Sequence, residues 1–276
     1  MRGRRRRKNT LLSGRRSLPI KIAIVAVIII VLVLLLIPSN SGGGSGADIK
    51  NVKKRGTLRV GVSNSMAGFS DGKNGLEIEL ARRIASEIFP DIKTNPSRLT
   101  TVVIAPSFMS THFSDSSVDI AIMQCPKGLY SSKYSYSDSY YTDSCIIAIK
   151  GGDDENKPIS ELSIGVLTNS ICKVRITTYL SAEGLKSAVT EYPTYETLLN
   201  GLKNGEVKAC VLPGIYYKKF AAEHSLKAHS VKLPDIEYAV VCSPENEDFI
   251  YLTNTLLADM KKSGELDKLI NKYTGG

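Results

Sequence analysis

The stretch that decides the fold is residues 57–88, TLRVGVSNSMAGFSDGKNGLEIELARRIASEI. Its first six residues, TLRVGV, are a short apolar run of the length expected for one buried strand. After a polar loop, apolar residues recur at helical spacing on Leu80, Ile84 and Ile88, and Pro90 ends the pattern. The stretch therefore predicts a strand followed by a helix, which is the repeating unit of an α/β fold.

The same alternation continues toward the C-terminus. Apolar runs predict strands at residues 101–105, 118–123, 145–149, 163–167, 207–212 and 238–242. Striped segments predict helices at residues 107–114, 172–180, 195–203 and 216–224, and a long helix from 249 onward. Because strands that alternate with helices usually pair in parallel, we expect parallel sheets.

The net charge of +9 is concentrated at the N-terminus. Residues 1–21 hold nine Lys and Arg and no acid, so the remaining 36 − 9 = 27 basic residues balance the 27 acidic ones. A basic surface that binds nucleic acid has to lie on a folded face, whereas this one lies on a terminal tail. We therefore expect no nucleic-acid binding.

A candidate membrane segment follows the basic tail. Residues 22–37, IAIVAVIIIVLVLLLI, are uncharged and apolar. Residues 18–20 extend this segment to nearly the ~20 residues that are needed to span the ~30 Å hydrocarbon core of a bilayer. Lys21 can be accommodated because its long side chain can extend to the membrane interface. The positive-inside bias predicts a cytoplasmic tail, a single span in the cell membrane and an exported remainder.

The alternative for the same segment is a secretory signal, cleaved near Ser39 or Ser41, which would release the protein from the cell. Both interpretations export the rest of the chain. Residues 38–52 begin with PSNSGGGSG and are interpreted as a flexible Gly/Ser linker.

Four stretches, taken in order, resemble the bacterial extracellular solute-binding proteins of family 3, the amino-acid receptors of ABC uptake systems. They are GTLRVGVSNSMAGFS (56–70), NGLEIELARRIA (74–85), YSDSYY (136–141) and GELDKLINKYTG (264–275). The resemblance implies a two-lobe periplasmic-binding-protein-like fold of type II, with a two-strand hinge that crosses near 141–145 and 237–241. Lobe 1 would be residues 53–141 plus 241–276 and lobe 2 residues 142–236, and a bound ligand would close them.

The sequence departs from the resemblance where an amino acid would bind. The family pattern implies an Arg in lobe 1 for the α-carboxylate and an Asp in lobe 2 for the ammonium. These positions are Tyr130 and Pro213 here. Each charge-assisted hydrogen bond contributes about 1.5–3 kcal/mol, so a site that lacks both should bind free amino acids ~100-fold or more weakly. We interpret the neighbouring cation, Lys127, as a solvated loop residue.

The other positions that map to the cleft are also uncharged. The candidate ligand-binding residues are Ser63, Met66, Phe69, Met123, Cys125, Tyr130, Asn169, Ser170 and Pro213. Such a lining suits a neutral or weakly polar solute. Met66 and Phe69 fit interior packing equally well, and Tyr130 also fits a structural role in its loop.

Signals for metal, redox or catalytic chemistry are missing from the sequence. The five Cys are an odd number without a C-x-x-C pair, so one disulfide remains an open alternative. The three His lack ligand spacing, and no nucleophile elbow, zincin or phosphate-loop motif occurs. We expect no metal, no cofactor and no catalytic residue.

The first functional hypothesis is a membrane-tethered, monomeric solute-binding protein that presents a small polar or neutral solute, other than a standard free α-amino acid, to an ABC permease. A second hypothesis is a degenerate receptor that serves as a sensor or protein-interaction module at the cell surface. A third is an enzyme, which would need a carboxylate or a His beside Tyr130 in the cleft.

Overall fold

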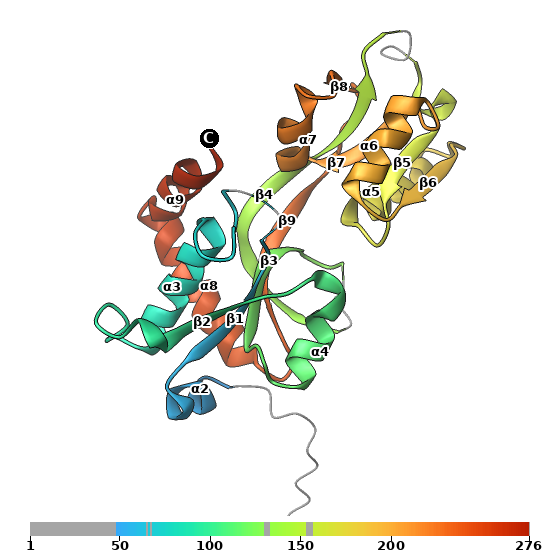
Figure 1. Ribbon diagram of the computed structural model, residues 1–276. Helices are drawn as coiled ribbons and strands as arrows, with labels where there is room; N and C mark the ends of the chain where they lie inside the picture. The colour runs from blue at the N-terminus through green and yellow to red at the C-terminus, as the bar shows by residue number, and fades with distance from the viewer. Residues whose placement is uncertain (1–47, 65, 67, 130–132, 153–156, 276) are drawn as a thin grey trace, which may run out of the picture. The chain divides into compact units, whose positions relative to one another are not determined.

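The chain divides into two units, Met1–Gly43 and Gly44–Gly276. The structure, a computed structural model, describes residues 48–275 except 65, 67, 130–132 and 153–156, all of which belong to the second unit (Figure 1). The basic tail, the predicted membrane segment and most of the linker lie outside the described residues. Within the described part, no helix is long and apolar enough to cross a bilayer.

The first lobe is built on three parallel strands. They are β1 (Leu58–Val62), with β2 (Leu99–Val103) on one side and β3 (Ile120–Pro126) on the other. Its helical segments are α3 (Leu76–Ile88), η1 (Pro96–Arg98), η2 (Pro106–Phe108) and α4 (Met109–Ser114). The apolar stripe of α3 lies inside, because Leu80 and Ile84 are fully buried and Ile88 is nearly so.

The second lobe repeats the arrangement. Its parallel strands are β5 (Ile164–Leu167), β6 (Val189–Tyr192) and β7 (Ala209–Pro213). Its helical segments are η3 (Ile159–Glu161), α5 (Ile171–Ala182), α6 (Tyr195–Asn204) and α7 (Gly214–Ala221). The short strands β6 and β8 (Leu226–Ala228) are absent from the sequence-based prediction, because each exposes at least half of its residues and lacks an apolar run.

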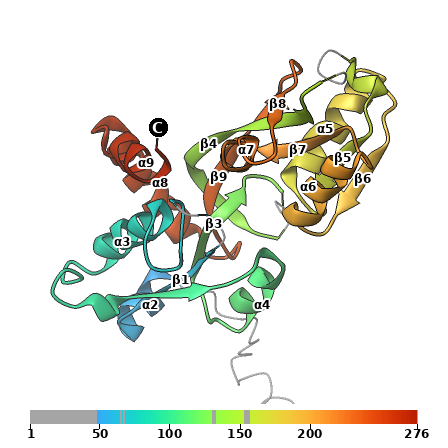
Figure 2. The ribbon, with the colours of Figure 1, turned by 45° about the horizontal axis from the view of Figure 1, so that its top comes forward.

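Two long strands run side by side from one lobe into the other (Figure 1, Figure 2). They are β4 (Ser135–Lys150) and β9 (Leu233–Cys242), which pair antiparallel along most of their length. β9 is also antiparallel to β3, and β4 to β7, so one continuous mixed sheet results, in the order β2-β1-β3-β9-β4-β7-β5-β6. The expectation of purely parallel sheets is therefore wrong for the two crossing strands, which traverse both lobes in opposite directions.

The remaining helices complete the first lobe. They are α2 (Ile49–Arg55), α8 (Glu247–Lys262) and α9 (Glu265–Thr274). α2 begins within the stretch interpreted as linker, because Asp48 caps its N-terminus and Val52 is fully buried. Arg55 then pairs with the buried carboxylate of Asp119, which fixes α2 against the folded body.

Candidate functional site

A cavity of about 430 Å³ lies at the carboxyl ends of strands from both lobes. Residues that follow β1 and β5, the last residues of β3 and β7, and Tyr238 of the crossing strand β9 all line it. Open α/β sheets bind ligands outside the carboxyl ends of their strands, so this cavity is the candidate ligand site.

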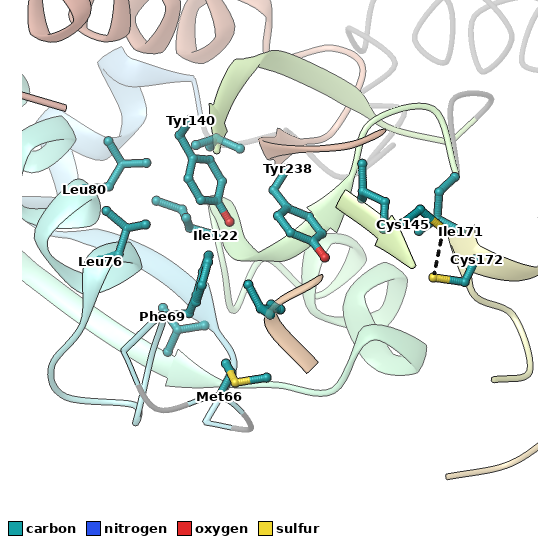
Figure 3. Close-up of a cluster of buried hydrophobic side chains, with 14 of the residues drawn as sticks. Met66, Phe69, Leu76, Leu80, Ile122, Tyr140, Cys145, Ile171, Cys172 and Tyr238 are labelled. Atoms are coloured by element: carbon teal, nitrogen blue, oxygen red, sulfur yellow. Dashed lines mark hydrogen bonds between the residues drawn. The ribbon is translucent and has the colours of Figure 1, made fainter. Parts of the chain in front are cut away.

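The cavity brings together most of the residues singled out from the sequence. These are Ser63, Met123, Cys125, Asn169, Ser170 and Pro213. Tyr130 lies outside the described residues. Met66 and Phe69 are not part of this lining: they are only 5% and 2% exposed, and they border a separate hollow with Tyr141. Phe69 packs edge-on against Tyr238, with ring centroids 6.4 Å apart (Figure 3).

The second lobe contributes an aromatic wall that sequence reasoning missed. Tyr195, at the start of α6, stacks on Tyr216 of α7 with ring centroids 4.1 Å apart and planes 28° apart. Both line the cavity together with Tyr238. Burial raises the pKa of Tyr195 and of Tyr238 well above the ordinary value, so these two rings present neutral hydroxyls.

Three carboxamide side chains also line the cavity, from Asn64, Gln124 and Asn169. Only Asn169 was expected there. Gln124 and Asn169 both have a backbone φ of 55°, in the left-handed region that non-glycine residues rarely adopt. The side-chain nitrogen Nε2 of Gln124 is buried and has no hydrogen-bond partner among the described residues.

The backbone of Gln124 is held by a buried carboxyl group. Its N–H donates to Oε1 of Glu77 at 2.7 Å, and the hydroxyl of Tyr140 donates to the same oxygen. Glu77 is fully buried, and burial raises the pKa of its carboxyl to about 7, although hydrogen bonds from the Tyr140 hydroxyl and the Gln124 backbone, and the contact with the Gln124 side chain, lower it. Glu77 thus supports the cavity from behind without lining it.

A second buried carboxyl group, that of Asp143 on β4, lies behind the other end of the cavity. Its Oδ2 accepts the N–H of Ile215 at 3.2 Å, and a Cβ on Gly214 would meet its Oδ1 at 2.5 Å. Burial raises the pKa of Asp143 to about 6, because the hydrogen bonds it accepts offset desolvation only in part. The carboxyl therefore holds the first turn of α7, which carries Tyr216.

No charged side chain occurs among the described residues that line the cavity. Lys127 is exposed and is not among them, and its backbone N–H donates to the carbonyl of Glu237 at 2.7 Å. A solute in this cavity would therefore meet amides, hydroxyls, thiols, rings and aliphatic carbon.

All five cysteines are buried free thiols. The sulfurs of Cys145 and Cys172 lie 3.7 Å apart and are not bonded, and Cys172 lines the cavity (Figure 3). Within the described ranges, no three His, Cys, Asp or Glu side chains are grouped closely enough to hold a metal ion.

The two lobes, the two crossing strands and a cavity at the strand ends define the class of periplasmic-binding-protein-like solute receptors. Residues 58–276 match the family model of the bacterial extracellular solute-binding proteins, family 3, and the chain belongs to this family. The resemblance inferred from the sequence is thereby confirmed.

Solved structures with the same fold include proteins that bind amino acids. A mutant of ArgBP from T. maritima is 22% identical, with 83% of this chain and 99% of that chain covered and a TM-score of 0.64. AbpA from Streptococcus pneumoniae, an amino acid ABC transporter substrate-binding protein bound to L-arginine, is 24% identical, with 82% and 98% covered and a TM-score of 0.63.

A third similar structure is AncCDT-1, an ancestral amino acid-binding protein described as a precursor of cyclohexadienyl dehydratase. It is 19% identical, with 82% of this chain and 98% of that chain covered and a TM-score of 0.63. At these identities the likeness establishes the fold alone. A search of curated protein sequences gives no match.

Proposed function

We propose that this protein is an extracytoplasmic solute-binding protein of an ABC-type uptake system. Residues 22–37 tether it to the cell membrane, with the basic tail in the cytoplasm and the Gly44–Gly276 unit outside as a monomer. The family supports the uptake role, and the basic-then-apolar pattern supports the tether. The partner is an ABC permease, to which the closed, loaded form is presented.

The solute is a small uncharged molecule. The observation that carries this proposal is the absence of any charged side chain among the described lining residues of the cavity. Burying a zwitterion or a cation in such a cavity leaves its charges unpaired, which is strongly unfavourable.

The cavity also distinguishes this function from the alternatives. A degenerate receptor predicts a cleft filled by side chains, whereas about 430 Å³ is open here. The enzyme hypothesis calls for a carboxylate or a His that acts as acid or base at the site, and neither is among the described lining residues. Both observations favour solute binding.

A thermal-shift screen of the Gly44–Gly276 unit against metabolites tests the proposal, because a ligand at 100 times its Kd stabilises by about 2.7 kcal/mol. We expect uncharged solutes to raise the melting temperature, and L-arginine or L-glutamate at ~1 mM to leave it unchanged. A Tyr216→Ala variant should lose the shift, while Tyr251→Ala, at a residue on α8 that is 77% exposed and outside the cavity, should keep it. A shift produced by free amino acids alone would overturn the uncharged-solute proposal.

A further inference from the structure

We infer that the solute of this cavity presents a planar amide group beside a flat apolar or aromatic portion. The inference rests on the solute-binding function proposed above and narrows its ligand class. The evidence is the set of carboxamide and tyrosine residues with which both lobes line the cavity.

The first argument is the chemistry of the carboxamides. Asn64, Gln124 and Asn169 follow or end β1, β3 and β5, so both lobes contribute. Each carboxamide places an N–H donor and a C=O acceptor side by side in one plane. Its complement is another amide, which satisfies both atoms with two parallel hydrogen bonds, as Asn and Gln do at the edge of adenine. A carboxylate offers only acceptors and would leave the carboxamide oxygens unpaired.

The second argument is the unusual backbone that positions two of these groups. Gln124 and Asn169 have the same left-handed φ of 55°. For a non-glycine residue this conformation costs on the order of 1 kcal/mol, and Asn tolerates it far better than Gln. The left-handed Gln124 is nevertheless locked in place, because its N–H donates to the buried Glu77.

The third argument is the weakly paired donor of Gln124. Its Nε2 is buried beside the carboxyl of Glu77, whose pKa the side chain lowers, but it makes no hydrogen bond of normal geometry to the described residues. Such a group costs about 1–3 kcal/mol. A rotation of the side chain toward the cavity would exchange this weak contact for a full hydrogen bond to a carbonyl oxygen of the solute, so a matching ligand offsets the cost.

The fourth argument is the aromatic wall of the second lobe. The stacked rings of Tyr195 and Tyr216, and the ring of Tyr238, border the same cavity. Aromatic faces bind flat partners by stacking, and bases held in protein sites combine such stacking with hydrogen bonds along one edge. The cavity therefore offers aromatic rings on which the flat portion of a solute can stack and carboxamides that can hydrogen-bond its polar edge.

Matched pairs of compounds test the inference on the Gly44–Gly276 unit, which forms one compact body. The pairs are nicotinamide with methyl nicotinate, indole-3-acetamide with methyl indole-3-acetate, and N-acetyl-L-tyrosinamide with L-tyrosine. Each pair keeps the ring and replaces the neutral amide. The chain contains no Trp, so the fluorescence of the indole compounds reports their binding directly, and isothermal titration gives the affinities of all six.

We expect at least one amide to bind about tenfold more tightly than its matched compound, because the loss of one hydrogen bond lowers affinity by about this factor. Asn169→Asp keeps the shape and tolerates the left-handed backbone, but it removes the amide donor, so affinity for that amide should fall about tenfold. Gln124→Glu should act in the same direction. The control Asn204→Asp, at the exposed end of α6, should bind as the unchanged protein does.

If esters or L-tyrosine bind as tightly as the amides, or if Asn169→Asp and Gln124→Glu leave amide affinity unchanged, the amide inference fails while solute binding stands. If none of the six compounds binds, the amide inference also fails, and the metabolite screen described above then decides separately whether the proposed function fails with it.

Discussion

Glu77 shows how one buried residue couples the cavity to the core. Its Oε1 accepts the N–H of Gln124, which lines the cavity, and the hydroxyl of Tyr140, which is only 1% exposed. The other oxygen, Oε2, is buried without a described partner. Burial disfavours the charged form of this carboxyl and so raises its pKa to about 7.

The raised pKa predicts a loss of stability with increasing pH. The carboxyl of Glu77 has an ordinary pKa of 4.5 and a pKa of about 7 in the folded protein. The stability that its proton provides is therefore fully present below about pH 4.5 and is lost as pH rises through 7, by about 3 kcal/mol in total. Glu77→Gln, which cannot ionise, should flatten the pH profile, as measured by urea denaturation at pH 5 and pH 8.

The groups that face Glu77 are Tyr140 from β4 and Cys125 and Gln124 from β3. Burial and the charge of Glu77 raise the pKa values of Tyr140 and Cys125, so neither titrates within this pH window. The matched control is Glu87→Gln on the exposed side of the same helix. Identical pH profiles for Glu77→Gln and Glu87→Gln would show that Glu77 is not the titrating group.

At the scale of the element, helix α6 carries the cavity residue Tyr195 directly after its cap. Oγ1 of Thr194 accepts the N–H of Thr197 at 3.1 Å, and Oγ1 of Thr197 accepts the N–H of Thr194 at 3.2 Å. This reciprocal capping box fixes the first turn of the helix and the direction in which Tyr195 leaves it.

Removal of the cap should destabilise the second lobe. We expect Thr194→Ala to lower the free energy of unfolding by about 1 kcal/mol, because an N–H at the start of the helix loses its acceptor. The control is Thr255→Ala in the exposed interior of α8, which should change the free energy by less than about 0.5 kcal/mol. Equal effects of the two variants in urea denaturation would show that the cap is not the source of stability.

Most helices and strands could be predicted because their buried faces require apolar residues at regular intervals in the sequence. The stripe Leu80, Ile84 and Ile88 predicts α3, since all three side chains lie in the core. The edge strand β6, Val189–Tyr192, buries only Tyr192, so its sequence carries too little alternation to reveal it. The antiparallel pairing of the crossing strands joins segments that are distant in the sequence, and local hydrophobic periodicity does not show which strands pair or in which direction.

The cavity was harder to predict than the fold. Positions such as Ser63, Asn169 and Pro213 could be placed because the resemblance to the family maps them to the cleft, and they line the cavity. Tyr195 and Tyr216 lie on helices, and their direction depends on how α6 and α7 pack on the sheet. Gln124 could not be recognised either, because its left-handed backbone and its contact with Glu77, 47 residues away in the sequence, leave no local pattern.

At the scale of the whole molecule, the five cysteines are spread across the body and all are buried. Burial raises the pKa of Cys125, Cys210 and Cys242 to about 12, and the contact with Cys145 together with burial raises the pKa of Cys172 well above its ordinary value, which keeps these thiols protonated. Protonated, buried thiols react slowly. We expect Ellman's reagent to titrate fewer than about one thiol in the folded protein and all five after denaturation.

The same titration decides the open question of a disulfide. If Cys145 and Cys172, whose sulfurs lie 3.7 Å apart, are joined in the isolated protein, only three thiols will react after denaturation without reductant. Fast reaction of any thiol before denaturation would contradict the burial that the structure assigns.

The central claim is that the cavity between the strand ends of the two lobes binds an uncharged solute. It is tested most directly by isolating the protein from its native host under mild conditions, denaturing it, and identifying the released small molecule by mass spectrometry. The account predicts a molecule without net or zwitterionic charge at pH 7 that contains a planar amide. Release of arginine or another free α-amino acid in stoichiometric amount would contradict it.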